Sequence, residues 1–318
     1  MLCGLSGSGK STLAEELLKR YENRVTYIAS DKIREEICGN ENDQSKNTEV
    51  FEIIHKRIRD WSKDENSTTY LIYDATNLTY KNRRQILQNI SKDIKKIIYI
   101  VATPVNVCIE RDKNRDRHVY EQVIKNQVSR FEMPQKFEGF DDIQMYHEFK
   151  YDWETEYNLF NSMIGFNQEN PHHKYTLFEH MSKSYYEAVL ANESYDLCEA
   201  LKFHDVGKLF TKTYDENHIA HYYNHANVST YYMLVNNHLF NNSINLSYVL
   251  FLIQNHMRIR DINKLEKTRS KFIKLWGEKA YDDLLKFAKY DEIGTGISEV
   301  EHINIDNKWY SAKITIIH

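Results

Sequence analysis

Cysteine is scarce in this 318-residue sequence, and none of its four cysteines forms a CxxC pair. The four are Cys3, Cys38, Cys108 and Cys198. We interpret them as reduced thiols of a cytosolic protein, so a cytoplasmic location is expected. Any metal site must therefore rest on histidine and aspartate.

The sequence also lacks a long apolar run and an excess of positive charge. It has no stretch of about 18 apolar residues, which excludes an ordinary membrane span, and no membrane partner is expected. Its start, MLCGLSGSGK, has neither the basic segment nor the long apolar stretch of a secretory signal. The formal net charge is −4, so the chain as a whole presents no basic field for nucleic acid. A local basic patch can still provide one.

The residues that are present favour two packed domains. Hydrophobic residues make up 41% of the chain and charged residues 28%, a balance that permits packed cores. The length exceeds that of one ordinary domain.

Strand and helix patterns alternate in the first half. Apolar runs of strand length occur at 25–29, 70–73 and 97–101, and each ends at polar residues. Between them, the segment from Asn47 to Trp61 carries on one helical face the apolar residues Val50, Phe51, Ile54, Ile58 and Trp61. This alternation predicts an α/β domain with a parallel sheet and a ligand site at the carboxyl ends of the strands. Residues 1–3 are too few for a typical strand, so either this strand is short or the true start lies upstream.

The second half is mostly helical in pattern. Strand-like runs disappear from about Tyr151, and helical segments rich in histidine and tyrosine follow. Neither an internal repeat nor a linker rich in proline and glycine is found. We predict an α/β domain over 1–150, an all-α domain over 151–318 and a terminal strand within 303–318.

The segment GLSGSGKS matches the phosphate-binding pattern G-x-x-x-x-G-K-[ST], and it stands between a strand and a helix. Glycines let successive backbone N–H groups point at phosphate oxygens, and the helix N-terminus adds positive potential. Lys10 is expected to neutralise the β- and γ-phosphates, and the Ser11 hydroxyl to complete a Mg²⁺ shell. The expected residues for ATP, or another NTP, are Gly4, Gly7, Gly9, Lys10, Ser11 and Thr12.

Two acidic residues follow predicted strands in this domain. Asp31 is a candidate general base for an attacking hydroxyl, and Arg34, one helical turn later, is a candidate contact for an anionic acceptor. Asp31 is also suited to cap the helix that follows it. Asp74 is a candidate acceptor-side or Mg²⁺-water ligand, and alternatively a turn residue of DATN.

The segment 111–117 is dense in arginine. It is either a lid that neutralises the transferring phosphoryl group or a solvated helix face with i,i+4 ion pairs.

The ordered segments GLSGSGKS, ASDKIREE, DATNLTYKNRR and ERDKNRDR resemble the P-loop polynucleotide 5′-kinases over residues 1–150. The kinase module of phage-type polynucleotide kinase–phosphatases is the most similar. The resemblance implies that Asp31 is the base for a 5′-hydroxyl, that Arg34 holds the acceptor's neighbouring phosphate and that Arg115 is the lid arginine. It extends to Arg83, Asp74, Arg111 and Arg117.

Histidines and aspartates in the second half form a candidate metal site around the doublet His204-Asp205. Imidazole nitrogens and carboxylate oxygens suit Mn, Fe, Co, Ni or Zn, and six ligands are enough for two ions. A lone histidine is more often structural, which is how His55, His118, His147, His218 and His238 are interpreted.

The order His, His-Asp, His, His, Asp over residues 160–295 resembles the HD-domain metallophosphohydrolases. The resemblance implies the metal ligands His180, His204, Asp205, His225, His256 and Asp291. It also implies that Lys208 contacts a substrate phosphate, with His173 and Arg258 as further contacts.

The pairing of the two predicted domains indicates nucleic-acid end healing. A 5′-hydroxyl kinase joined to a 3′-phosphatase or 2′,3′-cyclic phosphodiesterase would prepare RNA or DNA ends for a downstream ligase, with RNA favoured. The alternatives are a kinase of nucleosides or other small molecules fused to an HD nucleotide phosphohydrolase, and a nucleotide-sensing regulator. The regulator ranks last, because Lys10, Asp31, His204 and Asp205 are all present.

Overall fold

The computed structural model describes residues 1–41, 43–115, 118–147 and 153–297, and these form two compact units. Unit 1 comprises Met1–Trp153 and Asn227–Leu239, and unit 2 comprises Glu154–Ala226 and Phe240–His318. The expected domain boundary between residues 150 and 151, the terminal strand within 303–318, and Arg117 all lie outside the described residues.

Unit 1 contains a parallel sheet. Its strands are β1 (Leu2–Cys3), β2 (Val25–Ala29), β3 (Tyr70–Asp74), β4 (Ile97–Ala102) and β5 (Asp142–His147). Parallel pairs join β2 to β3, β1 to β4 and β4 to β5, and β1 lies beside β3. The spatial order is therefore β2-β3-β1-β4-β5, which confirms the predicted parallel sheet. Strand β5 was not predicted, because DIQMYH contains no continuous apolar run.

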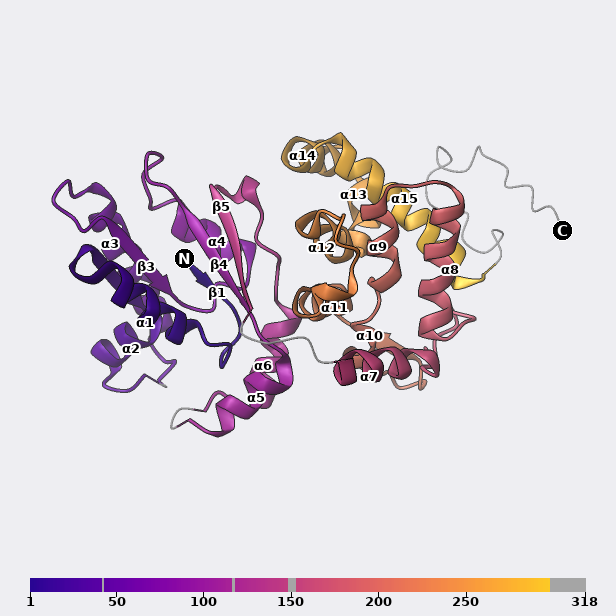
Figure 1. The fold of residues 1–318 in the computed structure, drawn as a ribbon, viewed down its shortest axis with the longest axis horizontal. Coiled ribbons are helices and arrows are strands. Elements are labelled where there is room, and N and C mark those ends of the chain that lie inside the picture. Colours follow the sequence, from indigo (N-terminus) through magenta and orange to yellow (C-terminus); the bar gives the residue numbers. More distant parts are fainter. Residues whose placement is uncertain (42, 116–117, 148–152, 298–318) are drawn as a thin grey trace. The chain divides into compact units, whose positions relative to one another are not determined.

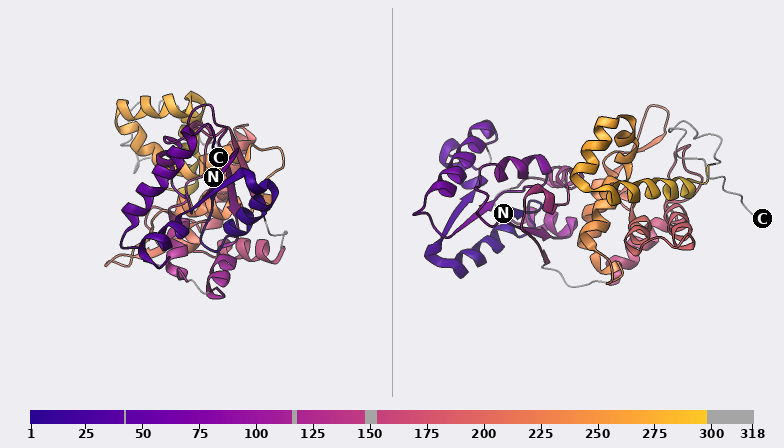
Figure 2. Two further views of the ribbon diagram at one scale, coloured as in Figure 1. Left: turned by 90° about the vertical axis from the view of Figure 1, so that its left-hand side faces the viewer. Right: turned by 90° about the horizontal axis from the view of Figure 1, so that it is seen from above.

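Helices flank this sheet on both of its faces (Figures 1 and 2). They are α1 (Lys10–Tyr21), α2 (Ser30–Cys38), α3 (Asn47–Lys63), α4 (Tyr80–Leu87), α5 (Val105–Lys113) and α6 (Glu121–Ser129), with the short 3₁₀ turns η1 (Glu22–Arg24) and η2 (Lys136–Glu138). Helix α11 (His225–Val235) begins in unit 2, and unit 1 includes its residues from Asn227 onward together with η3 (Asn237–Leu239). The Tyr231 hydroxyl donates to the carbonyl oxygen of Thr103 (2.8 Å), at the end of β4.

Helix α3 shows how the sequence specifies its packing. Val50, Ile54 and Ile58 recur at four-residue spacing and are completely buried, in a cluster that includes Ile28 of β2 and Tyr73 of β3. This spacing places them on one stripe of the helix, as the periodicity predicts.

Unit 2 is mostly helical. Its helices are α7 (Trp153–Ile164), α8 (Leu177–Leu190), α9 (Tyr195–Phe203), α10 (Lys208–Thr211), α12 (Leu246–Asn255), α13 (Ile259–Lys264), α14 (Glu266–Trp276) and α15 (Glu278–Thr295), with the 3₁₀ turn η4 (His256–Arg258). Helix α8 packs on α9 and α15, and α9 packs on α12. The expectation that strands disappear here was wrong at one place: β6 (Lys212–Tyr214) and β7 (Ala220–Tyr222) form an antiparallel hairpin.

Capping residues place the helices that carry the predicted metal ligands. Thr176 and Glu179 form a capping box at the start of α8, four residues before His180. Ser194 caps α9, which ends immediately before His204, and Asn245 caps α12, which ends before His256. The caps satisfy free N–H groups, so each helix begins at a defined residue.

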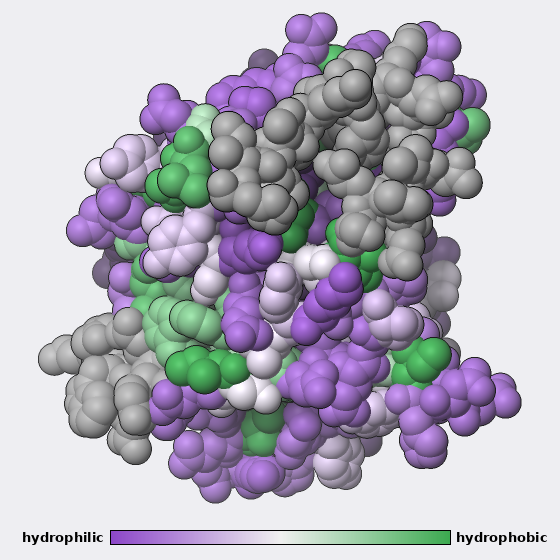
Figure 3. Space-filling view, turned by 90° about the vertical axis from the view of Figure 1, so that its right-hand side faces the viewer, coloured by the Kyte–Doolittle hydropathy of each residue, from purple (hydrophilic) through white to green (hydrophobic). Residues whose placement is uncertain are grey.

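The face of the molecule in Figure 3 shows hydrophobic residues as separate small areas among hydrophilic ones. Among the described residues, no helix combines the length and the apolar character that a bilayer crossing demands.

Candidate functional site

The loop between β1 and α1 has the backbone of a phosphate cradle. Gly7 has φ of 77°, and a Cβ atom there would stand 2.5 Å from the carbonyl oxygen of Cys108. Gly4 is tightly packed as well, since a Cβ atom would lie 2.8 Å from the carbonyl oxygen of Val101. Only glycine fits these two places. The loop ends at Gly9, and Lys10 begins helix α1, whose N-terminus faces the loop.

Lys10 and Ser11 lie where the motif requires them, while Thr12 is exposed in the first turn of α1. The buried ammonium group of Lys10 donates to the carbonyl oxygen of Leu5 (2.6 Å). Burial lowers the pKa of Lys10, and the Asp74 carboxylate opposes that change. A phosphate would supply this side chain with the counter-charge that a buried ammonium group needs.

Asp74, at the end of β3, is buried beside Ser11. Its Oδ2 accepts hydrogen bonds from the Ser11 hydroxyl (3.2 Å) and from the Tyr27 hydroxyl (2.9 Å). Hydroxyl and carboxylate oxygens are the ligands that Mg²⁺ prefers, so this pair fits an ATP-associated Mg²⁺ ion. Asp74 thus lies on the phosphate side of the loop, and the alternative of a simple turn residue does not describe it. Sequence reasoning missed Tyr27, because it lies inside an apolar run.

Asp31 and Arg34 are brought together on α2. The Arg34 guanidinium donates to Asp31 Oδ1 (2.6 Å) and to Asn47 Oδ1 (3.4 Å) at the start of α3. Arg34 is buried, whereas the side chain of Asp31 is 46% exposed, so the carboxylate can reach a substrate. Helix α2 begins at Ser30, and Asp31 lies in its first turn.

Asp112 anchors the arginine-rich segment at its described residues 111–115. This buried carboxylate accepts hydrogen bonds from the backbone N–H groups of Val119 (3.0 Å) and Tyr120 (2.9 Å), and it pairs with Arg115. Asp112 therefore links Arg115 to the backbone at Val119 and Tyr120, and Arg115 is half-buried. The solvated-face alternative therefore does not describe this ion pair.

Arg83 is enclosed by protein groups, and its contacts serve the fold of unit 1. It is completely buried, and its guanidinium makes a two-bond ion pair with Glu138 (2.7 and 2.8 Å). It also donates to the carbonyl oxygens of Asn77, Leu78 and Glu132. These bonds fix the loop after β3 and leave Arg83 no route to a ligand.

In unit 2, four histidines and two aspartates converge. Two groups have the spacing of metal ligands: the first comprises His180, His204, Asp205 and Asp291, and the second comprises Asp205, His225 and His256. All but Asp291 are buried. Every one of the six predicted ligands is in this cluster.

Asp205 belongs to both groups and presents one oxygen to each. Its Oδ2 lies 3.2 Å from Nε2 of His180 and 3.4 Å from Nε2 of His204. Its Oδ1 lies 3.1 Å from Nε2 of His225 and 3.7 Å from Nε2 of His256. This is the arrangement of a carboxylate that bridges two ions.

Backbone carbonyl groups orient three of the imidazoles. Nδ1 of His204, His225 and His256 lies 2.7 to 2.8 Å from the carbonyl oxygen three residues earlier in each case. A carbonyl oxygen can only accept, so Nδ1 carries the proton and Nε2 offers a lone pair to the cluster centre. Fixing the tautomer in this way is typical of histidine ligands.

The charge states of the cluster suit cations. Burial opposes ionisation of Asp205, but Lys208 and the surrounding imidazoles outweigh it and hold the pKa of Asp205 well below its usual range. Burial, with His204 and His225 nearby, lowers the pKa of His256 to about 3, so this imidazole is neutral. Burial opposes protonation of His180, but hydrogen bonds to Asp205 and Asp291 outweigh it and raise its pKa to about 9, so a bound ion would displace a proton from this ring. Imidazole nitrogens and ionised carboxylates are the ligand types that suit divalent transition-metal ions.

Lys208 lies at the edge of the cluster. Its ammonium group contacts Asp205 Oδ2 (2.6 Å), Gln168 Oε1 (2.8 Å) and His173 Nε2 (3.2 Å). Burial and the nearby Lys208 charge lower the pKa of His173 to about 3, so His173 accepts from Lys208. Arg258, by contrast, is exposed and donates to Asn255 Oδ1 (2.9 Å). Gln168 was missed, because nothing in its local sequence marks it as a lysine partner.

Comparisons with known proteins bear on unit 1. The family model AAA_33, described as an AAA domain, matches residues 1–134. An adenylyl-sulfate kinase of Buchnera aphidicola subsp. Schizaphis graminum (strain Sg) is 29% identical over 119 residues, which are 35% of this chain and 53% of that protein. The chain therefore spans about half the length of this curated relative.

Among solved structures, a gluconokinase from Sinorhizobium meliloti 1021 is similar, with 16% sequence identity and a TM-score of 0.34. The match covers 47% of this chain and 82% of that one. The matched family, the parallel sheet and the glycine loop agree with one another: the N-terminal part of this chain is a P-loop kinase-like α/β domain, followed by a helical region.

Proposed function

We propose that this protein is a bifunctional enzyme that heals broken nucleic-acid ends. Unit 1 is an ATP-dependent 5′-hydroxyl polynucleotide kinase. Unit 2, an HD-type metallophosphohydrolase, is a 3′-phosphatase or 2′,3′-cyclic phosphodiesterase. The observation that carries the proposal is the bridging position of Asp205 between two ligand groups, in a chain that also contains a phosphate cradle. Such a chain has one site suited to adding a phosphate and another suited to removing one.

In the kinase, each side chain has a separate task. Lys10 neutralises the phosphates of ATP, and Ser11 and Asp74 supply oxygen ligands on the Mg²⁺ side. Asp31 accepts the proton of the acceptor hydroxyl as its oxygen bonds to the γ-phosphorus and ADP leaves. Arg34 holds the acceptor's neighbouring phosphate, and Arg115 stabilises the charge of the transferring group.

In the phosphohydrolase, the six clustered histidines and aspartates would hold two divalent ions. Such ions supply Lewis acidity and a water-derived nucleophile. Lys208 orients the bridging carboxylate through its 2.6 Å contact with Asp205 Oδ2. When a substrate phosphate binds, Lys208 donates a hydrogen bond to a phosphate oxygen in place of Gln168 and so contacts the substrate.

One oligonucleotide tests both activities. It carries a 5′-hydroxyl and a 2′,3′-cyclic phosphate, and both ends are read by mass after incubation with ATP, Mg²⁺ and Mn²⁺. We expect the wild type to change both ends, Lys10→Ala to lose 5′-phosphorylation only, and Asp205→Asn to lose 3′-end processing only. Lys19→Ala on the exposed face of α1 and Asp215→Asn in the β6–β7 turn are matched controls that retain both activities.

A second function is favoured by the similarity to an adenylyl-sulfate kinase. In it, unit 1 phosphorylates a nucleoside or another small molecule, and unit 2 cleaves nucleotides. Unchanged oligonucleotide ends, together with ATP-dependent phosphorylation of a small acceptor, would replace the end-healing proposal with this one.

A further inference from the structure

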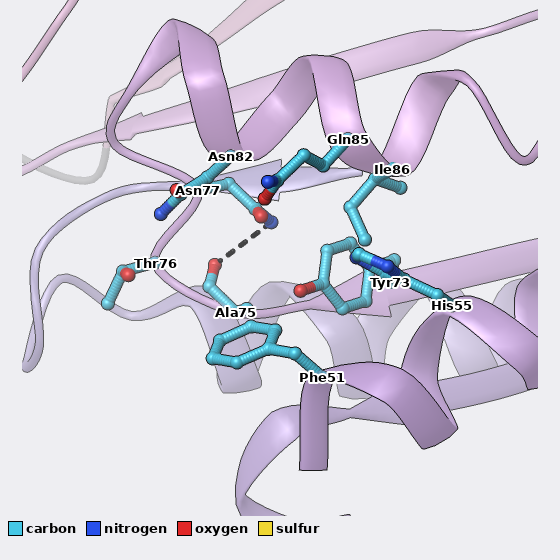
Figure 4. A pocket seen from close by; sticks show the side chains of 9 residues that line it. All are labelled: Phe51, His55, Tyr73, Ala75, Thr76, Asn77, Asn82, Gln85 and Ile86. Carbon is cyan, nitrogen blue, oxygen red and sulfur yellow. Dashed lines mark hydrogen bonds between the residues drawn. The ribbon is translucent and has the colours of Figure 1, made fainter. Parts of the chain in front are cut away.

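Unit 1 has a pocket of about 90 Å³ between α3, α4 and the segment that follows β3 (Figure 4). Aromatic side chains line one part of it: Phe51 and His55 from α3, and Tyr73 from β3. Amide side chains line another part: Asn77 in the loop after β3, and Asn82 and Gln85 from α4. No role in phosphate binding accounts for this combination.

The ring of Phe51, on the aromatic side of the pocket, is accessible to a ligand. It follows the buried residue Val50 on α3, yet it is 38% exposed. His55 lies one turn later on the same face, because residues four apart are neighbours on a helix. Burial and the charge of Arg59 lower the pKa of His55, so at neutral pH its ring offers one donor and one acceptor.

The floor of the pocket is tied to the phosphate cradle. The backbone N–H of Gly4 donates to the carbonyl oxygen of Thr76 (3.1 Å). The Asn77 amide donates to the carbonyl oxygen of Leu2 in β1 (2.7 Å). These two hydrogen bonds therefore fix the position of the pocket relative to the loop that binds the transferred phosphoryl group.

Helix α3 connects the pocket to Arg34, the residue proposed to hold the acceptor's phosphate. Arg34 donates to Asn47, and Asn47, Phe51 and His55 follow one another at four-residue spacing along α3. At about 1.5 Å per residue, Phe51 and His55 stand roughly 6 and 12 Å along the helix from Asn47. One nucleotide can bridge that separation with its phosphate at Arg34 and its base at Phe51.

We propose that this pocket binds the nucleobase of the acceptor's 5′-terminal nucleotide, with the ring face on Phe51 and the ring edge toward the amides of Asn82 and Gln85. This inference rests on the proposed kinase function. Asparagine and glutamine can make paired hydrogen bonds to base edges, and bases stack on exposed aromatic rings. An apolar cavity of about 150 Å³ can enclose a benzene ring, so the smaller pocket admits only part of a base and leaves the rest against Phe51.

The test compares two trinucleotides with a 5′-hydroxyl, one complete and one with an abasic 5′-terminal residue. Loss of one base stack weakens binding by roughly 5- to 150-fold. We therefore expect the wild type to show a KM at least about 5-fold higher for the abasic acceptor. Phe51→Ala should raise the KM for the complete acceptor to a similar degree. It should leave the KM for the abasic acceptor and for ATP unchanged.

Two further variants keep the test decisive. Gln85→Leu alters an exposed side chain, so it preserves folding and still removes amide contacts to the base. Tyr70→Ala removes a partly exposed aromatic ring at the opposite end of β3 and should leave both KM values unchanged.

The outcomes separate this inference from the function on which it rests. Equal KM values for the two acceptors would overturn the base pocket and leave the kinase standing. A raised KM for ATP in Phe51→Ala would assign the pocket to the donor nucleotide. That result would also overturn the proposal that the pocket binds the acceptor's base. A wild type that phosphorylates neither trinucleotide would remove the polynucleotide kinase and the base pocket together.

Discussion

At the scale of single residues, Asp205 is the side chain on which both candidate ligand groups of unit 2 depend. Its two oxygens face different groups of imidazoles, and Lys208 contacts one of them. Each imidazole that surrounds it has other contacts, whereas Asp205 alone belongs to both ligand groups. Its replacement should therefore affect two ions at once.

Asp205→Asn tests this bridge directly, because it keeps the shape of the side chain and removes its charge. An amide offers one oxygen instead of two, so we expect bound metal to fall from two ions per chain to one or none. Metal content is measured by mass spectrometry after loading with Mn²⁺ and dialysis. Asp215→Asn, whose carboxylate accepts hydrogen bonds only from groups of the β6–β7 hairpin, Asn217, Ile219 and His221, among those that the structure describes, is the control and should keep both ions. Two tightly bound ions in Asp205→Asn would contradict the bridging role.

At the scale of elements, the buried ion pair of Arg83 and Glu138 connects α4 to the turn η2. The same guanidinium holds three carbonyl oxygens, two of them in the loop after β3 that forms the pocket floor. The pair therefore positions a loop. Removal of one partner should destabilise unit 1 strongly, since a buried charge without a counter-charge is costly.

We expect Glu138→Gln to lower the free energy of unfolding of unit 1 by about 3 to 5 kcal/mol. The matched change is Glu36→Gln, which breaks the exposed ion pair of Glu36 with Arg57 and should cost no more than about 1 kcal/mol. Urea unfolding followed by circular dichroism measures both. Equal losses of unfolding free energy in the two variants would show that burial does not make the Arg83–Glu138 pair more important for stability than an exposed pair.

Local patterns were enough to predict some elements and not others. The parallel sheet and the glycine loop were predicted, because strand runs and the motif GLSGSGKS are continuous in the sequence. Strand β5 and the hairpin β6–β7 were missed, since each depends on a partner strand and not on its own apolar content. The pairing of Arg83 with Glu138 spans 55 residues, and no local pattern reveals it.

The candidate sites follow the same rule. The order of histidines and aspartates identified the six residues that cluster in unit 2, but the sharing of Asp205 and the backbone bonds to Nδ1 required coordinates. Phe51 was interpreted as part of the core face of α3, since its spacing fits that face. Its exposure, and with it the pocket, depends on where α4 packs.

At the scale of the whole molecule, the two units should respond to different ligands. A ligand that binds the folded state at 100 times its Kd stabilises it by about 2.7 kcal/mol. For units of this size that corresponds to a rise in Tm of roughly 5 to 10 °C. ATP with Mg²⁺ should stabilise unit 1 through Lys10, and Mn²⁺ should stabilise unit 2 through Asp205.

Calorimetry of the full chain and two variants checks this division. We expect Lys10→Ala to lose the rise in Tm with ATP and keep the rise with Mn²⁺, and Asp205→Asn to show the reverse. The comparison works whether the units unfold in one transition or two, because each variant removes one ligand's effect and retains the other's. If Asp205→Asn abolished the response to ATP as well, the two sites would be thermodynamically coupled. Kinase and phosphohydrolase would then act as one linked system, because a change at either site would alter ligand affinity at the other.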